Sequence, residues 1–166
     1  NFNQSNEVFT YNYTQTGNFS VKLRAVSTIG CISEEVTKTV PITSKPIASF
    51  SFSPIRCINT DITFTDASTS QVGTITKWTW NLDDGAGAVI TTTNVARTTQ
   101  YTSTGNKNVS LQVETASGCK SEVFIPTTLP FINPLPAPGF ILPEVCLNDA
   151  SAQFTDTSKI ADGSEA

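Results

Sequence analysis

An internal repeat constrains the fold of this chain more than any other feature, because several short matches keep one order and one spacing. The offset between matching segments drifts only from 88 to 90 residues. The matches are Tyr13-Thr-Gln-Thr-Gly17 with Tyr101-Thr-Ser-Thr-Gly105, Gly30-Cys31 with Gly118-Cys119, Pro54-Ile-Arg-Cys57 with Pro143-Glu-Val-Cys146, and Phe64-Thr-Asp-Ala-Ser68 with Phe154-Thr-Asp-Thr-Ser158. Chance similarity in a threonine-rich chain would not preserve this order. The repeat predicts tandem structural units.

The repeat divides the chain into one complete unit and two parts of units. Residues 45–128 form the complete unit, residues 1–44 the C-terminal half of a preceding one, and residues 129–166 a linker and the N-terminal part of a following one. Neither part has enough apolar surface to be stable alone. We therefore expect a segment of a longer tandem array. Alternatively, the incomplete halves pair across neighbouring copies by strand exchange.

The residue types favour an all-β fold. Threonine and β-branched residues are plentiful, and alternation with a period of two recurs, whereas no stretch has helical periodicity. Strands are predicted at 8–13, 18–26, 31–40 (ended by Pro41), 47–52, 61–66, 75–82, one or two within 86–96, 108–115 and 119–125. Residues 100–105 are expected to form a turn, and the prolines between 126 and 138 predict a stiff, extended spacer.

The stretch Trp78-Thr-Trp-Asn-Leu-Asp-Asp-Gly85 is the most informative single strand. Trp78, Trp80 and Leu82 alternate with polar residues, so one face is large and apolar. Asp84 and Gly85 tolerate the positive φ that a tight reversal needs. The stretch has three interpretations: a core strand of a β-sandwich, an exposed aromatic platform for a glycan, or an acidic turn that holds a cation.

The complete unit resembles the PKD (polycystic kidney disease) domain. The resemblance is carried by Phe64-Thr-Asp-Ala-Ser68, the Trp78–Gly85 stretch, Tyr101-Thr-Ser-Thr-Gly105 and Asn108-Val-Ser-Leu-Gln-Val113. Relative to the family signature, Leu82 and Asp83 replace Phe and Gly, and Lys107 replaces the second aromatic residue. The resemblance implies an immunoglobulin-like β-sandwich of about seven strands in two sheets. It makes Trp78, Trp80, Leu82, Asp84, Gly85, Tyr101 and Gly105 the structural signature.

The resemblance also implies function by display, since PKD domains are spacers and adhesion modules of secreted or surface proteins. The tandem copies are similar to those of large Bacteroidetes surface proteins, including gliding-motility adhesins and cargo of the type IX secretion system. We expect a non-enzymatic, extracellular or cell-surface spacer whose partners are neighbouring repeats, a surface glycan, or outer-membrane and secretion proteins. The alternatives are an accessory module of an extracellular hydrolase and a filament subunit assembled by strand exchange.

The four cysteines fall at two repeat positions: Cys31 with Cys119, and Cys57 with Cys146. An exported chain favours disulfides, and no Cys-x-x-Cys spacing indicates zinc. Cys57 precedes the second strand and Cys119 follows the sixth; these strands run the same way, so the two cysteines should lie at opposite ends of the sandwich. Three possibilities therefore remain open: a disulfide within the unit, a disulfide between consecutive units, and free thiols.

We expect no cofactor and no metal site; Asp66, Asp83 and Asp84 are the only acidic group that suits calcium. Calcium needs several oxygen ligands at one point. Asp66 ends one strand, and the Asp83-Asp84 pair ends the next, antiparallel one. We therefore expect them at opposite ends, with Asp83 and Asp84 shaping the turn.

Other classes of function find little support. The net charge is −4 and no basic stripe is present, which argues against nucleic acid. No apolar run approaches the roughly 18 residues of a membrane span. Without histidine, Ser-His and Cys-His catalysis is impossible. Tyr11, Tyr13 and Tyr101 are the candidates for glycan contact, although Tyr13 and Tyr101 occupy turns where tyrosine usually packs over a sandwich corner.

Overall fold

The computed structural model describes residues 8, 10–145 and 151–161, and every regular element among them is a β-strand. The predicted all-β class is therefore confirmed. The strands are β1 (Gly17–Leu23), β2 (Val36–Ile42), β3 (Phe50–Phe52), β4 (Ile62–Asp66), β5 (Ile75–Asn81), β6 (Ala88–Thr91), β7 (Arg97–Thr99), β8 (Gly105–Asn106), β9 (Ser110–Thr115), β10 (Phe131–Ile132), β11 (Phe140–Ile141) and β12 (Thr155–Asp156). No helix in the described ranges is long and apolar enough to cross a membrane.

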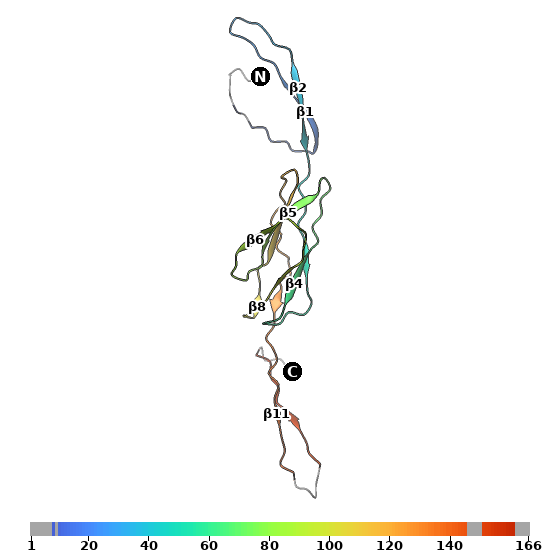
Figure 1. Cartoon of the computed structure of the whole chain (residues 1–166), viewed down its shortest axis with the longest axis vertical. Coiled ribbons are helices and arrows are strands. Elements are labelled where there is room, and N and C mark those ends of the chain that lie inside the picture. Colours follow the sequence, from blue (N-terminus) through green and yellow to red (C-terminus); the bar gives the residue numbers. More distant parts are fainter. Residues whose placement is uncertain (1–7, 9, 146–150, 162–166) are drawn as a thin grey trace.

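Three parts follow one another along the long axis (Figure 1). The β1–β2 hairpin lies at one end and the β11–β12 hairpin toward the other. Between them, strands β3, β4 and β7 form one antiparallel sheet, and β6, β5 and β9 form a second. This two-sheet arrangement is the expected immunoglobulin-like sandwich.

Strand β5 is central to its sheet and carries the largest side chains of the core. β6 lies on one side of it and β9 on the other; Trp80, for example, is opposite Val89 and Leu111. Trp78 and Trp80 are only 6% and 1% exposed. Because burial of a large apolar side chain contributes roughly 1.5–3 kcal/mol, this strand anchors the unit. The interpretation of the stretch as a core strand is confirmed, and the aromatic platform is wrong.

The core joins both sheets and the adjoining turns. Phe50 and Phe64 of one sheet pack on Trp80 of the other, with ring centroids 5.2 and 6.5 Å from it. The buried apolar residues are Ala48, Phe50, Ile62, Phe64, Trp78, Trp80, Leu82, Tyr101, Val109, Leu111, Val113 and Ile132.

Two strand predictions in the N-terminal part are wrong. The described residues of 8–13 form no strand, and Val8 and Tyr11 are 97% and 70% exposed. Their counterpart in the central unit is β7, which pairs with β4; the described N-terminal residues contain no counterpart of β4 to pair with. Pro41 does not end its strand but lies within β2, opposite Asn18. An edge strand tolerates proline, because the missing N–H can face the open side.

Two further predictions need correction near the end of the central unit. The strand predicted at 119–125 is not continuous, and this segment pairs with β9 only through isolated bridges. The ladder is interrupted because the Val113 N–H donates to the Ser121 hydroxyl, at 3.0 Å, and not to a main-chain carbonyl. The predicted turn at 100–105 ends in β8, which pairs with β10. The start of the predicted spacer therefore belongs to the sandwich, and Ile132 of β10 is fully buried. Predicted strands within 47–52, 61–66, 75–82 and 108–115 are present in shortened form.

Candidate functional site

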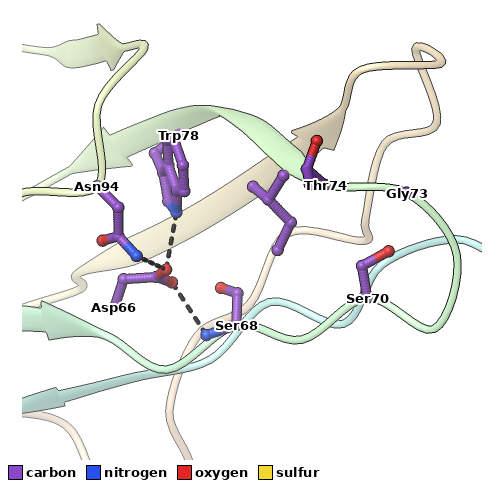
Figure 2. A pocket seen from close by; sticks show the side chains of 8 residues that line it. Asp66, Ser68, Ser70, Gly73, Thr74, Trp78 and Asn94 are labelled. Atoms are coloured by element: carbon purple, nitrogen blue, oxygen red, sulfur yellow. Dashed lines mark hydrogen bonds between the residues drawn. The ribbon is translucent and has the colours of Figure 1, made fainter.

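An open hollow lies at the end of the sandwich where β4 finishes and β5 begins (Figure 2). Its volume is about 380 Å³. It is lined by Asp66, Ser68, Ser70, Gly73, Thr74, Ile75, Trp78 and Asn94. Asp66 is the only charged residue in this lining, so it dominates the electrostatics of the hollow.

The Asp66 carboxylate is held by three protein donors (Figure 2). One oxygen accepts the Trp78 indole N–H at 2.8 Å and the Asn94 side-chain amide at 3.0 Å. The other oxygen accepts the Ser68 backbone N–H at 3.0 Å. These bonds connect the two sheets and the loop after β6, so the carboxylate has a structural role: it holds these three segments together.

The Asp83-Asp84-Gly85 turn joins β5 to β6. The predicted reversal is present, but its positive φ values fall on Asp83 and Gly85, at 55° and 85°, and not on Asp84 as predicted. Asp83 accepts the Asn108 backbone N–H at 2.8 Å. Asp84 accepts the Ala86 N–H at 3.0 Å and the Thr99 hydroxyl at 3.1 Å. The two carboxylates therefore connect the turn to neighbouring segments.

The three candidate calcium ligands do not converge. Asp84 contacts Thr99, which pairs with Ile62 at the start of β4, whereas Asp66 ends that strand. Strand β4 has five residues, so the two groups are separated by roughly 13 Å along it. Within the described ranges, no three His, Cys, Asp or Glu residues are grouped for metal binding.

Tyr101 lies inside the sandwich and closes the same end as the acidic turn. It is 3% exposed, and its hydroxyl donates to the Leu82 carbonyl. Burial, followed by the charges of Asp84 and Asp83, raises the pKa of Tyr101. The Lys107 ammonium lies 5.1 Å from its ring centroid, which explains why a lysine fits where the family has an aromatic residue. Gly105 follows with a φ of 100°, a conformation suited to glycine.

The other two tyrosines lie before β1. Tyr13 is half-buried and contacts Phe19, with ring centroids 4.5 Å apart. Tyr11 packs edge-on against Tyr13 at 4.8 Å and is largely exposed. The buried position of Tyr101 removes it from the glycan candidates and leaves Tyr11 and Tyr13.

Cys57 and Cys119 lie at opposite ends of the sandwich, as expected. The Cys119 sulfur is 3.3 Å from the Thr43 hydroxyl, at the connection to β2. The main chain of Cys57 instead forms an isolated parallel β-bridge with Asn133, near the connection to β11. Among the described residues, Cys31, Cys57 and Cys119 form no disulfide with one another, and the positions of Cys57 and Cys119 at opposite ends exclude a bond between these two; pairing between consecutive units stays a prediction, and Cys146 lies outside the described residues. Hydrogen bonds from Thr43 and Ser117 lower the pKa of Cys119.

Sequence reasoning missed the residues that tie the carboxylates in place. Asn94, Thr99 and Asn108 each donate to one of the three aspartates. They come from segments far from those aspartates in sequence, and no spacing signal announces such contacts.

Comparison with known proteins identifies the module. A family model for the PKD domain matches residues 43–128. Among solved structures, the PKD1 domain of Vibrio anguillarum Epp is similar at 21% identity and a TM-score of 0.43, over 52% of this chain and 94% of that one. No curated protein matches the chain. The family match covers just over half of the sequence, and the chain therefore belongs to the PKD domain family.

Proposed function

We propose that this chain is a structural and adhesive spacer segment of a large secreted or cell-surface tandem-repeat protein. PKD domains are typically extracellular structural or adhesive modules and are generally non-catalytic. The sandwich contributes its polar groups to internal contacts, and its largest side chains to its core. Such a unit is suited to separating and projecting other domains.

The observation that carries the proposal is a repeated hydrogen-bond pattern. The turn after β1 forms the same contacts as the turn after β9, at positions 88 residues apart. The paired contacts are Ser27 N to Cys31 O with Thr115 N to Cys119 O, Ala25 N to Ser33 Oγ with Val113 N to Ser121 Oγ, and Ser33 N to Ala25 O with Ser121 N to Val113 O. Equivalent local structure at equivalent positions supports a tandem array of one module.

The connection between the β1–β2 hairpin and the central unit is short and has contacts of its own. The Thr43 hydroxyl meets the Cys119 sulfur, and a hollow of about 280 Å³ lies between residues 16–18, 41–44 and 71–72. Lys45 at the start of the central unit pairs with Glu122 of the same unit at 2.6 Å, but this exposed pair stabilises little and does not reach the hairpin. These contacts favour a connection of limited bending, as a spacer requires.

The narrower parts of the proposal concern location and partners. We place the protein outside the cell, with gliding-motility or type IX secretion-dependent adhesins as its kind, on the basis of its repeat style and cysteine positions. Its direct partners would be neighbouring repeats, with a surface glycan or an outer-membrane or secretion protein as further ligands. Tyr13 occupies the position of the buried Tyr101, which favours Tyr11 for any glycan contact.

A second candidate is a filament subunit completed by strand exchange. It is favoured by the exposed apolar side chains of both hairpins: Leu23 is 70% exposed and Phe140 64%. In this case chains would associate end to end. The accessory role beside an extracellular hydrolase differs from both, because it requires an adjoining catalytic domain in the same protein.

Small-angle X-ray scattering with analytical ultracentrifugation on the full chain tests the spacer function. We expect an extended particle with the 17.8 kDa mass of one chain at all concentrations. A matched variant with Pro134, Pro136 and Pro138 changed to serine should keep this mass and become more flexible. A compact particle would contradict the spacer function, and growth of the mass with concentration would favour the filament.

A further inference from the structure

The β11–β12 hairpin copies the β3–β4 hairpin of the central unit in detail. Phe140 lies opposite Asp156, as Phe50 lies opposite Asp66. The Ser158 N–H donates to Asp156 at 2.8 Å, as Ser68 donates to Asp66 at 3.0 Å. The paired bonds that complete the copy are Gly139 N to Ser158 Oγ with Ser49 N to Ser68 Oγ, and Ala137 N to Lys159 O with Ile47 N to Thr69 O.

In the central unit, this local structure receives tryptophans from the opposite sheet. The second oxygen of Asp66 accepts the Trp78 indole N–H, and Trp80 lies 5.2 Å from the Phe50 ring. As a result, Phe50 and Phe64 are only 7% and 0% exposed. The central unit is thus an internal template for what covers such a hairpin.

On the β11–β12 hairpin the same face is open. Phe140 and Phe154 contact each other at 6.4 Å, close to the 6.0 Å of Phe50 and Phe64, yet they are 64% and 62% exposed. Within the described part of the chain, Asp156 receives hydrogen bonds only from Ser158, on one oxygen. The second oxygen corresponds to the one that binds the indole in the central unit.

We propose that this open face is a docking surface for the Trp-x-Trp strand of a PKD-type sheet, with Asp156 accepting the indole N–H of the first tryptophan. The second tryptophan covers Phe140 and Phe154. Tryptophan fits both halves of the surface, since it combines a large apolar ring with a single N–H donor. The inference rests on the proposed function, because a tandem array is what supplies the strand. The strand would come from the part of the array that follows the β11–β12 hairpin.

A second copy of this chain is a poorer occupant. Its Trp78 and Trp80 are already buried in its own core. Releasing them would require that unit to unfold. The strand must therefore come from a unit that has no β3–β4 hairpin of its own.

The test extends the full chain, after Ala166, with a second copy of its residues 77–133. The offset of 90 then places the added tryptophans where the template has them. Hydrogen exchange of residues 139–157, followed by mass spectrometry, reports on the hairpin alone, because this sequence occurs once in the extended chain. We expect the extension to increase its protection. Asp156→Asn keeps an acceptor for Ser158 and removes the second carboxylate oxygen, so it should lower that protection about tenfold.

Two matched variants make the result specific. Changing only the added Trp78 to Phe should reduce protection to a similar extent, and combining it with Asp156→Asn should cause no further loss. In the chain without the extension, Asp156→Asn should leave exchange of the hairpin unchanged.

Three outcomes would overturn the docking inference: no added protection on extension, independent additive effects of the two variants, or protection of the unextended chain that rises with its concentration. If the extended chain scatters X-rays as a longer rod but Asp156→Asn does not change the protection of the hairpin, the docking inference fails and the spacer function stands. The two proposals therefore fail separately.

Discussion

The Trp78 indole nitrogen lies 2.8 Å from the Asp66 carboxylate, and this contact joins the two sheets of the sandwich. A carboxylate with three N–H donors tolerates partial burial, because each donor offsets part of its lost hydration. The signature tryptophan thus has two roles: its ring fills the core, and its N–H holds the end of β4.

Removing the indole N–H, together with part of the buried Trp78 ring, should destabilise the central unit. Trp78→Phe keeps an aromatic ring in the core but leaves Asp66 with one donor fewer. We expect a loss of about 1–3 kcal/mol in the free energy of unfolding, measured by urea denaturation with Trp80 fluorescence. Thr76→Ala, an exposed change in the same strand, should stay within about 0.5 kcal/mol. Equal effects of the two changes would show that the bond contributes nothing.

The acidic turn should be stabilised by its internal hydrogen bonds and not by calcium. Asp83 has a positive φ and accepts the Asn108 N–H, so Asp83→Ala loses both a tolerant residue and an acceptor. We expect a cost of about 1–3 kcal/mol, whereas Asp83→Asn should cost much less. Millimolar calcium should leave the thermal midpoint of the wild type unchanged. A midpoint that rises with calcium in the wild type, but not in Asp83→Asn, would contradict this assignment.

The buried phenol of Tyr101 should make the unit sensitive to alkali. Burial raises the pKa of Tyr101 above its ordinary value of 10.0, so the folded state retains a proton that the unfolded state loses. The stabilising contribution is therefore complete below pH 10 and is lost as the pH rises further. Urea midpoints measured from pH 8 to pH 11 should fall more steeply in the wild type than in Tyr101→Phe. Parallel slopes would show that the phenol does not remain protonated in the fold.

Periodicity accounted for the parts of the fold whose side chains alternate. The pattern around Trp78 and Trp80 identified the core strand, because one face of a β-strand must be apolar when it packs on a second sheet. The placement of Cys57 and Cys119 at opposite ends of the sandwich followed from strand direction alone. In both cases the information is local or topological, and the sequence contains it.

Contacts that depend on the meeting of distant loops could not be predicted in this way. Asn94 reaches Asp66, and Thr99 reaches Asp84, only after the strands have paired, and no spacing marks these residues beforehand. Ile132 lies among the five prolines between 126 and 138, a stretch whose composition predicts a spacer; its burial depends on pairing with Gly105. Whether such a segment becomes a buried strand or an exposed spacer depends on the strand it pairs with, and the residue types of the segment itself do not determine it.

The contact between Thr43 and Cys119 offers a chemical probe of the connection to the β1–β2 hairpin. The Thr43 hydroxyl, followed by that of Ser117, stabilises the thiolate and lowers the pKa of Cys119. Thr43→Val should raise that pKa and slow the alkylation of Cys119 by iodoacetamide at mildly alkaline pH, because the thiolate is the reacting species. Mass spectrometry of the Cys119 peptide measures the rate, and Cys57, at the other end of the sandwich, is the internal control.

Ser117→Ala is the matched variant, since Ser117 lies beside Cys119 and does not depend on the hairpin. It should slow the same reaction by a local effect. If Ser117→Ala slows alkylation and Thr43→Val does not, the hairpin does not rest against the central unit in solution. If both slow it, the side chains across this connection meet as the structure shows, and a spacer with limited bending at this point is supported.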